Sequence, residues 1–285
     1  MKGFEIQGMH IHIVTLENDR FMPSYLVNRL AGLWREQGHR VDVGPSSLLD
    51  ADIGIMNIDR TRVPVICLPD NPEGRPLLNA AILDISKRRI SKNILRPDSG
   101  YTGPVIIKTD ANAGGWPEWA ATSPRILRGA SRLLGRALSW RLTRQLVYGD
   151  YPVLNDPACV PPWVWQRDDL VVERFIPERE ADEYVLRSWL FFGDQEYGVK
   201  IFSRFPVVKV RNATRHEYVD EVPDTIRQAR VHLDMDFGKM DYVIAGDEAI
   251  LLDVNKTPTV SAASPATDNL RRLASGLSHY LKGVK

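Results

Sequence analysis

The stretch MDYVIAGDEAILLDVNKTP, residues 240–258, decides the fold of this chain. Two short apolar runs, residues 242–245 and 249–254, flank the turn-forming Gly-Asp-Glu sequence of residues 246–248. Apolar runs on both sides of a short Gly/Asp turn are typical of a β-hairpin. We therefore predict two antiparallel strands joined by a three-residue loop, and we take this hairpin as the point from which to read the rest of the chain.

Three polar side chains share one face of this hairpin. With a three-residue loop, Asp241 lies directly opposite Asp253, and the alternation of side chains along a strand puts Asn255 on the same face. Two facing carboxylates about 5 Å apart repel by roughly 3 kcal/mol at an effective dielectric of about 20. The patch therefore predicts a bound cation, and its hard oxygens suit Mg²⁺ held together with substrate phosphates. A solvated hairpin face with an ordinary turn at residues 255–258 is the alternative.

The composition limits the class of protein. A chain of 285 residues can bury a substantial core and divide into one to three subdomains. A net charge of +1 argues against a general nucleic-acid-binding role. Cys67 and Cys159 fit no zinc site, and we expect two buried thiols in a reducing compartment. Because no apolar run approaches the length of a membrane span and the N-terminus lacks a signal peptide's apolar region, we expect a cytoplasmic protein without a transmembrane segment.

The N-terminal part predicts a small α/β unit. A helix is expected at residues 25–37, and strand-like runs lie at residues 9–14, 41–43, 53–58 and 63–68. Strands that alternate with helices form parallel sheets, which bind ligands at the carboxyl ends of their strands. Residues 17–20 and 59–62 are therefore candidates for substrate binding, with plain solvated loops as the alternative. The chain has no GxGxxG motif, so a dinucleotide is not indicated.

A short predicted strand at residues 105–108 ends in a lysine. Lys108 is followed by the adjacent Gly114 and Gly115, and glycines near a strand end let backbone N–H groups approach an anion. The chain has no GxxxxGK[ST] motif, so this segment is not a Walker loop. The lysine and the glycines indicate either a phosphate-binding loop or a plain turn.

Two basic segments flank this strand. Residues 77–95 predict a helix that carries Lys87 and Lys92. Residues 124–147 predict a second helix, whose arginines at helical spacing include Arg125, Arg128, Arg132 and Arg136. Such a helix could bind a membrane surface or an acidic partner. Alternatively, it is a core helix whose arginines form its solvated face, and we favour this second interpretation.

The last third of the chain predicts a sheet. Residues 170–176 form a strand that ends at Pro177. Further strands are expected at residues 184–192, 197–202 and 207–210, and helices at residues 223–234 and 266–281. The basic residues of this region, some of which we expect to face phosphates, are Arg187, Lys200, Arg204 and Lys209.

These motifs together resemble the ATP-grasp superfamily. Its members carry an aspartate on one strand and an acidic-x-Asn pair on the next, often before a proline-containing turn, and "MDYVI" and "LLDVNKTP" match this pattern. The order of a helix lysine, a strand lysine with glycines, an E-x-F-I hinge and the D…D-x-N set is also that of the family. One residue departs from it, because Asp253 stands where Glu is more usual. A shorter side chain would hold one metal ion well and bridge a second poorly.

The resemblance implies ATP and Mg²⁺ as cofactors and assigns roles to single residues. Asp241, Asp253 and Asn255 are the implied metal ligands. Lys108 and a helix lysine, Lys87 in preference to Lys92, are the implied phosphate ligands, with Gly114 and Gly115 in a flexible lid. The implied hinge at the adenine consists of Glu173, Arg174, Phe175 and Ile176. Glu180 is the ribose candidate, with Glu183 as the fallback, and Lys209 is a further nucleotide contact.

The resemblance also implies a fold and a division of the chain. The expected fold combines α/β and α+β parts, an ATP-grasp fold preceded by a Rossmann-like α/β unit. Residues 1–75 would form the N-terminal substrate unit. Residues 76–168 would form the linker helix and the lysine-bearing lid, and residues 169–285 the C-terminal ATP- and Mg-binding subdomain.

The implied activity is that of an ATP-dependent ligase. A carboxylate attacks the γ-phosphate to give an acylphosphate, and an amine displaces phosphate to form an amide. Lys108, Arg187 and Arg204 are the expected catalytic residues, and the partners would be a small-molecule acid and amine, with no nucleic acid and a homodimer left open. A small-molecule kinase and a non-catalytic nucleotide-binding protein on the same fold are the alternatives. The sequence does not identify the acid or the amine.

Overall fold

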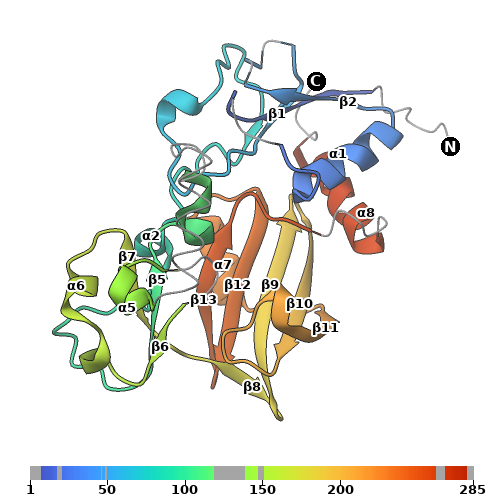
Figure 1. Cartoon of the computed structure of the whole chain (residues 1–285). Coiled ribbons are helices and arrows are strands. Elements are labelled where there is room, and N and C mark those ends of the chain that lie inside the picture. The colour runs from blue at the N-terminus through green and yellow to red at the C-terminus, as the bar shows by residue number, and fades with distance from the viewer. Residues whose placement is uncertain are drawn as a thin grey trace.

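The computed structural model describes residues 8–17, 21–45, 47–48, 50–118, 139–146, 151–260 and 267–280. Within these residues the strands form three sheets, of four, six and three strands. Figure 1 shows the four-stranded sheet at the top, the six-stranded sheet in the centre and the three-stranded sheet to one side. A parallel α/β unit thus precedes two antiparallel sheets, which is the combination that the sequence predicts.

The N-terminal sheet is parallel and is centred on a buried strand. Its strands are β1 (His10–Val14), β2 (Arg40–Gly44), β3 (Ile53–Met56) and β4 (Leu77–Leu78), in the order β2-β1-β3-β4. Ile11 and Ile13 are fully buried in one cluster with apolar residues of α1 (Leu26–Glu36). Because β2 and β3 lie on opposite sides of β1, the carboxyl ends of β1 and β3 form a switch point, where sheets of this type bind ligands.

The three-stranded sheet is antiparallel. β5 (Val105–Thr109) pairs with β6 (Val153–Leu154) on one side and β7 (Leu170–Arg174) on the other. Val105 and Ile107, two residues apart on β5, point to the same small core. Prolines restrict the chain before β7 to single helical turns, which are η3 (Pro157–Cys159) and α6 (Pro162–Trp165). Another single turn, α5 (Trp140–Thr143), ends at Arg144, which has a left-handed conformation.

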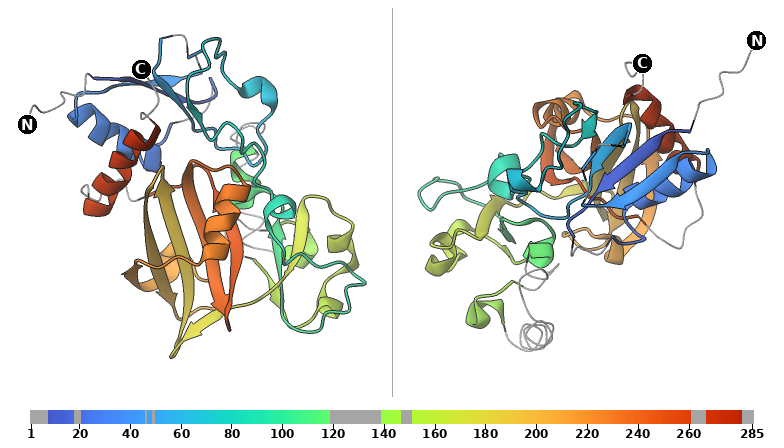
Figure 2. Two further views of the ribbon diagram at one scale, coloured as in Figure 1. Left: turned by 180° about the vertical axis from the view of Figure 1, so that it is seen from behind. Right: turned by 90° about the horizontal axis from the view of Figure 1, so that it is seen from above.

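The six-stranded sheet holds the hairpin. Its strands are β8 (Glu178–Glu180), β9 (Glu183–Phe192), β10 (Gln195–Ser203), β11 (Ala213–Val219), β12 (Phe237–Ala245) and β13 (Glu248–Asn255). The order is β11-β10-β9-β12-β13, with β8 paired to β9. Helix α7 (Asp224–His232) buries Ile226 in a cluster with Trp189, Met240 and Val254 of the sheet. The sheet is therefore covered by a helix on this face, as Figure 2 shows from behind.

The two ends of the chain pack together above this sheet. Helix α8 (Asp268–Ser275), followed by η5 (Gly276–Tyr280), lies beside α1 in both figures. Leu270, Leu273 and Leu277 share one cluster with the buried residues of α1. Trp34 Nε1 donates a hydrogen bond to the carbonyl oxygen of Ala274 at 2.9 Å. Helix α8 thus packs between α1 and the six-stranded sheet and connects the N-terminal unit to this sheet.

The hairpin confirms the facing carboxylates but not the expected loop. Ala245 pairs with Glu248, so the turn has two residues rather than three, and Gly246 takes the positive φ of +60° that such turns require. The register then shifts, because Asp241 pairs with Asp253 whereas Tyr242 pairs with Leu251. Leu252 is the additional residue of a β-bulge. A shorter turn and a bulge together give the pairing that a three-residue loop would have given.

The prediction of a single helix at residues 77–95 is wrong. This segment contains β4 and one helical turn, α2 (Lys87–Ile90). Asn79 has a φ of +59°, and its side chain bonds the backbone of Asp236 and Phe237. Asp84 accepts a hydrogen bond from the backbone N–H of Ser86. Short polar side chains that bond the backbone in this way compete with helix formation.

Other expectations need smaller corrections. Residues 63–68 contain a 3₁₀ turn, η1 (Val65–Cys67), instead of a strand, and Ile66 is 92% exposed. Residues 207–210 are likewise no strand and lead into η4 (Val210–Asn212). Strand β11 was not predicted from the sequence, because an exposed edge strand lacks the alternation of apolar and polar residues on which the prediction depends. Cys159 is exposed and Cys67 half-buried, so the thiols are not both buried as predicted.

Part of the predicted basic helix falls outside the described residues. Residues 124–138 and 147, and with them Arg125, Arg128, Arg132 and Arg136, are not described. The candidate substrate residues 18–20 are also outside the described part. Among the described residues, no helix is long and apolar enough to cross a membrane.

Candidate functional site

A cavity of about 190 Å³ lies where the three-stranded sheet meets the six-stranded sheet. Strands β5 and β7 and helix α2 contribute to one wall, and β9, β12 and β13 contribute to the opposite wall. Its charged lining residues are Lys87, Lys108, Arg174, Lys209, Asp241 and Asp253. Its apolar lining includes Ile106, Phe175, Ile176, Pro177, Val185, Leu186, Val207, Val208, Val243 and Leu252.

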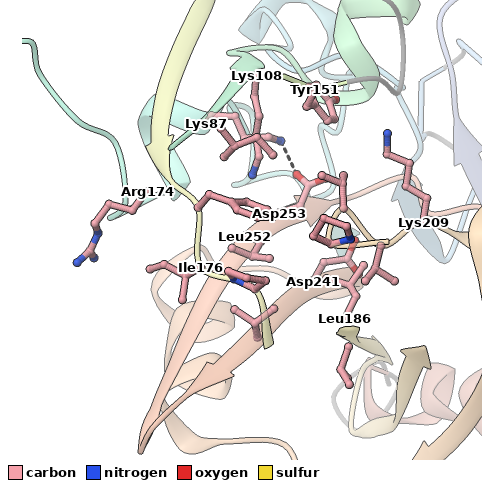
Figure 3. Close-up of a pocket in the computed structure, with 18 residues that line it drawn as sticks. Lys87, Lys108, Tyr151, Arg174, Ile176, Leu186, Lys209, Asp241, Leu252 and Asp253 are labelled. Carbon is pink, nitrogen blue, oxygen red and sulfur yellow. Dashed lines mark hydrogen bonds and ion pairs between the residues drawn. The ribbon is translucent and has the colours of Figure 1, made fainter. Parts of the chain in front are cut away.

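Two of the cavity lysines lie together with Asp253, apart from two of the aliphatic lining residues. In Figure 3, Lys87, Lys108 and Asp253 lie together on one side, and Ile176 and Leu186 lie on the other. A cavity of this kind can hold a molecule with a flat apolar ring and a strongly charged end.

Lys87 and Asp253 form an ion pair across the cavity. Their Nζ and Oδ1 atoms are 2.5 Å apart, and the lysine side chain is 6% exposed (Figure 3). Lys87 is the first residue of α2, whereas Asp253 is on β13. Burial by itself raises the pKa of Asp253, but the ammonium groups of Lys87, Lys239 and Lys108 outweigh it and hold this pKa below its ordinary value. Asp253 is therefore a carboxylate in this structure.

The facing Asp241 has a lysine partner of its own. Its Oδ2 lies 2.7 Å from Lys239 Nζ, and its Oδ1 accepts a hydrogen bond from Ser188 Oγ at 2.5 Å. Burial lowers the pKa of Lys239, but the carboxylates of Asp241 and Asp253 outweigh it and raise this pKa above its ordinary value. The two carboxylates are thus neutralised by two lysines. From the sequence we expected their repulsion to require a bound metal ion, but with these lysines in place the repulsion does not by itself require one.

Sequence reasoning missed Lys239, although a signal was present. Lys239 precedes Asp241 by two residues on the same strand, so the two side chains share one face. It also lies directly opposite Asn255. A hairpin face with two acidic residues, one amide and one lysine is nearly neutral once Lys87 is added.

Lys108 is bound to a deeply buried carboxylate. Its Nζ lies 2.7 Å from Glu173 Oε2, and the Glu173 residue is 1% exposed. The two residues come from β5 and β7, which pair with Ile106 opposite Glu173. Glu173 Oε1 has no hydrogen-bond partner within the described part of the chain. Glu173 itself is not part of the cavity lining, so it acts on the cavity through Lys108.

The hinge predicted from the sequence is only partly at the cavity. Phe175 and Ile176 line it, whereas the guanidinium of Arg174 points away and donates a hydrogen bond to Asn93 Oδ1 at 2.7 Å (Figure 3). Lys209 lines the cavity from the loop that follows β10, with its Nζ 5.2 Å from the ring centre of Tyr151. Lys92, the alternative to Lys87, is not in the lining.

Several predicted site residues lie outside the lining and have protein partners. Glu180 pairs with Lys200 at 2.7 Å, and Glu183 pairs with Arg215 at 3.0 Å. Arg187 holds Glu178 through two of its nitrogens, with a shortest distance of 2.7 Å. Arg204 is exposed after the end of β10.

The glycines after β5 form a left-handed turn. Ala113, Gly114 and Gly115 have φ values of +48°, +68° and +71° within η2 (Asn112–Gly115). They do not line the cavity. The backbone N–H of Asn112 donates to Thr61 Oγ1 at 2.8 Å, so the start of this segment is attached to the N-terminal unit.

Asp110, directly after β5, joins three segments. Its carboxylate accepts hydrogen bonds from the Arg62 guanidinium at 2.5 Å and from the backbone N–H of Arg88 at 2.9 Å. Its carbonyl oxygen accepts the backbone N–H of Lys87 at 2.9 Å. The two lysine-bearing elements and the N-terminal loop at residues 59–62 therefore share one buried junction.

The end of the hairpin also contacts the N-terminal unit. Asn255 Oδ1 accepts the backbone N–H of Thr257 at 2.9 Å, and Thr257 Oγ1 donates to Asp59 Oδ1 at 2.9 Å. Burial raises the pKa of Asp59, and the hydrogen bonds from Thr257 and Tyr25 only partly offset this. Nearby in sequence, Asn57 is 3% exposed at the end of β3, and neither of its amide atoms has a partner among the described residues. The candidate substrate loop therefore lies against the turn that follows Asn255.

The oxygen donors of the hairpin fit a small metal site. No group of three or more His, Cys, Asp or Glu side chains that could hold a metal ion occurs among the described residues. The candidate ligands from the sequence are the two cavity-lining carboxylates and the amide of Asn255, which lies outside the lining. Within the described chain, Asp253 Oδ2 makes no hydrogen bond, whereas its Oδ1 accepts from Lys87 and from Val254 N–H. This set suits a hard cation whose other ligands come from phosphates and water.

Comparisons with known proteins give structural matches only. No family model and no curated protein matches the sequence. A RimK domain ATP-grasp protein from Sphaerobacter thermophilus matches with a TM-score of 0.51 at 13% identity, over 93% of this chain and 99% of that chain. D-alanine–D-alanine ligase from Bacillus anthracis matches with a TM-score of 0.50 at 11% identity, over 96% of both chains. The ATP-grasp ligase PsnB, complexed with precursor peptide PsnA2 and AMPPNP, matches with a TM-score of 0.51 at 11% identity, over 95% of this chain and 98% of that chain. Matches at such identities concern the fold.

Proposed function

We propose that this chain, which has the ATP-grasp fold, is an ATP- and Mg²⁺-dependent ligase that joins a carboxylate to an amine. The carboxylate would attack the γ-phosphate of ATP to form an acylphosphate and release ADP. The amine would then displace phosphate and form an amide. One observation carries the proposal, namely a cavity with an apolar part and a charged part that holds Lys87, Lys108 and the facing Asp241 and Asp253.

The cavity suggests how ATP would bind. The adenine ring would lie in the apolar part, against Phe175, Ile176 and Leu186. The phosphates would then reach the side of Lys87 and Lys108. Each lysine is already oriented by a carboxylate, Asp253 or Glu173, so its ammonium is positioned before the nucleotide arrives. Preorganised charges of this kind stabilise a transferring phosphoryl group without reorganising during the reaction.

The hairpin would hold Mg²⁺ on the face that carries Asp241, Asp253 and Asn255. The ion would offset phosphate charge during transfer. The remaining task of this protein is to place the acid beside the γ-phosphate and to exclude water from the acylphosphate. Arg187, Arg204, Glu180, Gly114 and Gly115 keep their predicted roles as part of this proposal, and would reach the nucleotide only after a rearrangement.

The acceptor site would lie at the switch point of the N-terminal sheet. Asn57 and Asp59 follow β3 there, and Asp59 is bonded to the turn that follows Asn255. One of the similar solved structures is a ligase complexed with a precursor peptide. We therefore include peptide side chains, beside free acids and amines, among the candidate substrates.

Trapping the acylphosphate tests the proposal without knowledge of the amine. The protein is incubated with ATP, Mg²⁺, hydroxylamine and a panel of carboxylates and peptides, and hydroxamate and ADP are measured. A ligase yields both in equal amounts with its proper acid, and Asp253→Asn should yield neither. ADP with a phosphorylated alcohol and no hydroxamate would instead identify a kinase. ATP binding in calorimetry without turnover on any panel would identify a nucleotide-binding protein.

A further inference from the structure

The carboxylate of Asp241 is engaged on both of its oxygens. Oδ1 accepts the hydroxyl of Ser188 at 2.5 Å, and Oδ2 lies 2.7 Å from Lys239 Nζ. The Asp241 side chain is only 12% exposed. An ammonium group at this distance forms a charge-assisted hydrogen bond, and its positive charge would repel a metal ion that approached the second lone pair of that oxygen.

Asp253 is different, because one of its oxygens is open. Oδ1 is held by Lys87, whereas Oδ2 makes no hydrogen bond within the described residues, and the side chain is 33% exposed. Asn255 Oδ1 accepts the backbone N–H of Thr257 at 2.9 Å. The Thr257 hydroxyl lies 3.4 Å from the same oxygen, but its shorter hydrogen bond, at 2.9 Å, is to Asp59 Oδ1. Mg²⁺ needs six oxygen ligands at about 2.0–2.1 Å, and it usually takes one or two from carboxylates and the rest from phosphates and water.

Two metal ions would need more oxygen ligands than this hairpin provides. Paired ions in phosphoryl-transfer sites lie about 3.5–4 Å apart and depend on ligands that can serve both. Asp253 Oδ2 is the one carboxylate oxygen of the facing pair to which no described residue donates a hydrogen bond. Lys239 lies opposite Asn255 in register and on the same face as Asp241, and its ammonium is 2.7 Å from Asp241 Oδ2.

We propose that Lys239 takes the place of a second divalent cation, so that the site binds a single Mg²⁺ per nucleotide. The inference rests on the proposed nucleotide site. Lys239 contributes one fixed positive charge at Asp241, and the single ion is held at the open side of Asp253 with Asn255 and the phosphates.

Counting bound ions tests this directly. Mn²⁺ replaces Mg²⁺, a non-hydrolysable ATP analogue saturates the protein, and the electron paramagnetic resonance signal of free Mn²⁺ gives the number bound per nucleotide. We expect one ion in the wild type and in Lys239→Arg, which keeps the charge. We expect two in Lys239→Met, because removal of the ammonium opens Asp241 Oδ2. Arg227→Met, which removes an ion-paired cation that packs on Trp189 of the same sheet, should leave the count at one.

The number of bound ions in the wild type and in Lys239→Met either supports or overturns the inference. Two ions per nucleotide in the wild type would overturn the inference, and so would one ion in a folded Lys239→Met protein. If that variant does not fold, the wild-type count decides alone. A wild-type protein that binds no nucleotide in calorimetry would overturn the proposed function and this inference with it, whereas nucleotide binding with two ions overturns the inference only.

Discussion

At the scale of single residues, the cavity lysines are structural partners as well as proposed nucleotide ligands. Lys108 is the only side chain that neutralises Glu173 within the described residues, and Glu173 is almost fully buried. Lys108→Met should therefore lower the free energy of unfolding by about 3–5 kcal/mol, because it leaves a buried charge without a partner. Urea unfolding measures this loss.

The stability effect of Lys108 can be separated from its effect on ATP. Glu173→Gln removes the charge, so in this background Lys108→Met should be much less destabilising. ATP affinity in calorimetry should still fall by about 1.5–3 kcal/mol, the size of a charge-assisted hydrogen bond. If the double variant binds ATP as tightly as the Glu173→Gln protein, Lys108 is structural only.

Asp253 should show the same dual role through its pH dependence. Its pKa is lowered in the folded protein, so its ion pair contributes stability above the pKa of the unfolded state, about 3.9, and this contribution is lost as the pH falls through the lower folded value. Asp253→Asn should be less stable than the wild type at pH 7, because Lys87 remains buried without its partner. The difference should shrink below about pH 4. Thermal melting between pH 3 and pH 7 measures it, and a constant difference would refute this assignment.

At the scale of elements, the hairpin depends on a glycine that no motif marks. Gly238 has a φ of +152°, and a Cβ there would lie 2.6 Å from the carbonyl oxygen of Asn255. Gly246 in the turn has a φ of +60° with open space around it. Gly246→Ala should reduce stability by about 1–2 kcal/mol through the left-handed conformation alone. Gly238→Ala should reduce it by clearly more and should also weaken nucleotide binding, because it pushes Asn255 away from the site. Equal effects of the two changes in urea unfolding and ATP calorimetry would contradict this.

The same hairpin shows how far the sequence could be read. Apolar alternation and the Gly-Asp turn predict the strands and the facing of Asp241 and Asp253, because local patterns determine pairing. The bulge at Leu252 was not predictable, since nothing in the local sequence distinguishes Leu252 from its neighbour. Lys87 could be singled out as basic, but its partner Asp253 is 166 residues away. Contacts over such distances follow from tertiary packing, which no local pattern encodes.

At the scale of the whole molecule, two of the connections between the N-terminal unit and the rest of the described chain differ in kind. Helices α1 and α8 join it to the large sheet through a common apolar core. The loop at residues 59–62 joins it to the lysine-bearing elements, through Arg62 on Asp110 and Thr61 on Asn112. The first connection is apolar and suits a fixed support. The second is made of hydrogen bonds and ion pairs, so it connects the proposed substrate loop directly to the glycine-bearing segment that follows β5.

Breaking the second connection should release this segment and leave the first intact. In the wild type, ATP with Mg²⁺ should slow backbone hydrogen exchange at residues 112–118, as expected for a lid that orders on nucleotide binding. Arg62→Met leaves the buried Asp110 carboxylate without its guanidinium, and the loss of this hydrogen bond should weaken the junction by about 1–3 kcal/mol. Exchange at residues 112–118 should then be faster before nucleotide is added and less slowed after it, while exchange in α1 and α8 is unchanged. Arg75→Met is the matched control, because it removes an arginine of the same region whose ion pair is with Glu73. If both variants change hydrogen exchange at residues 112–118 to the same extent, the proposed connection between the loop at residues 59–62 and this segment is refuted. The change would then reflect a general loosening of the N-terminal unit and not the loss of the contact between Arg62 and Asp110.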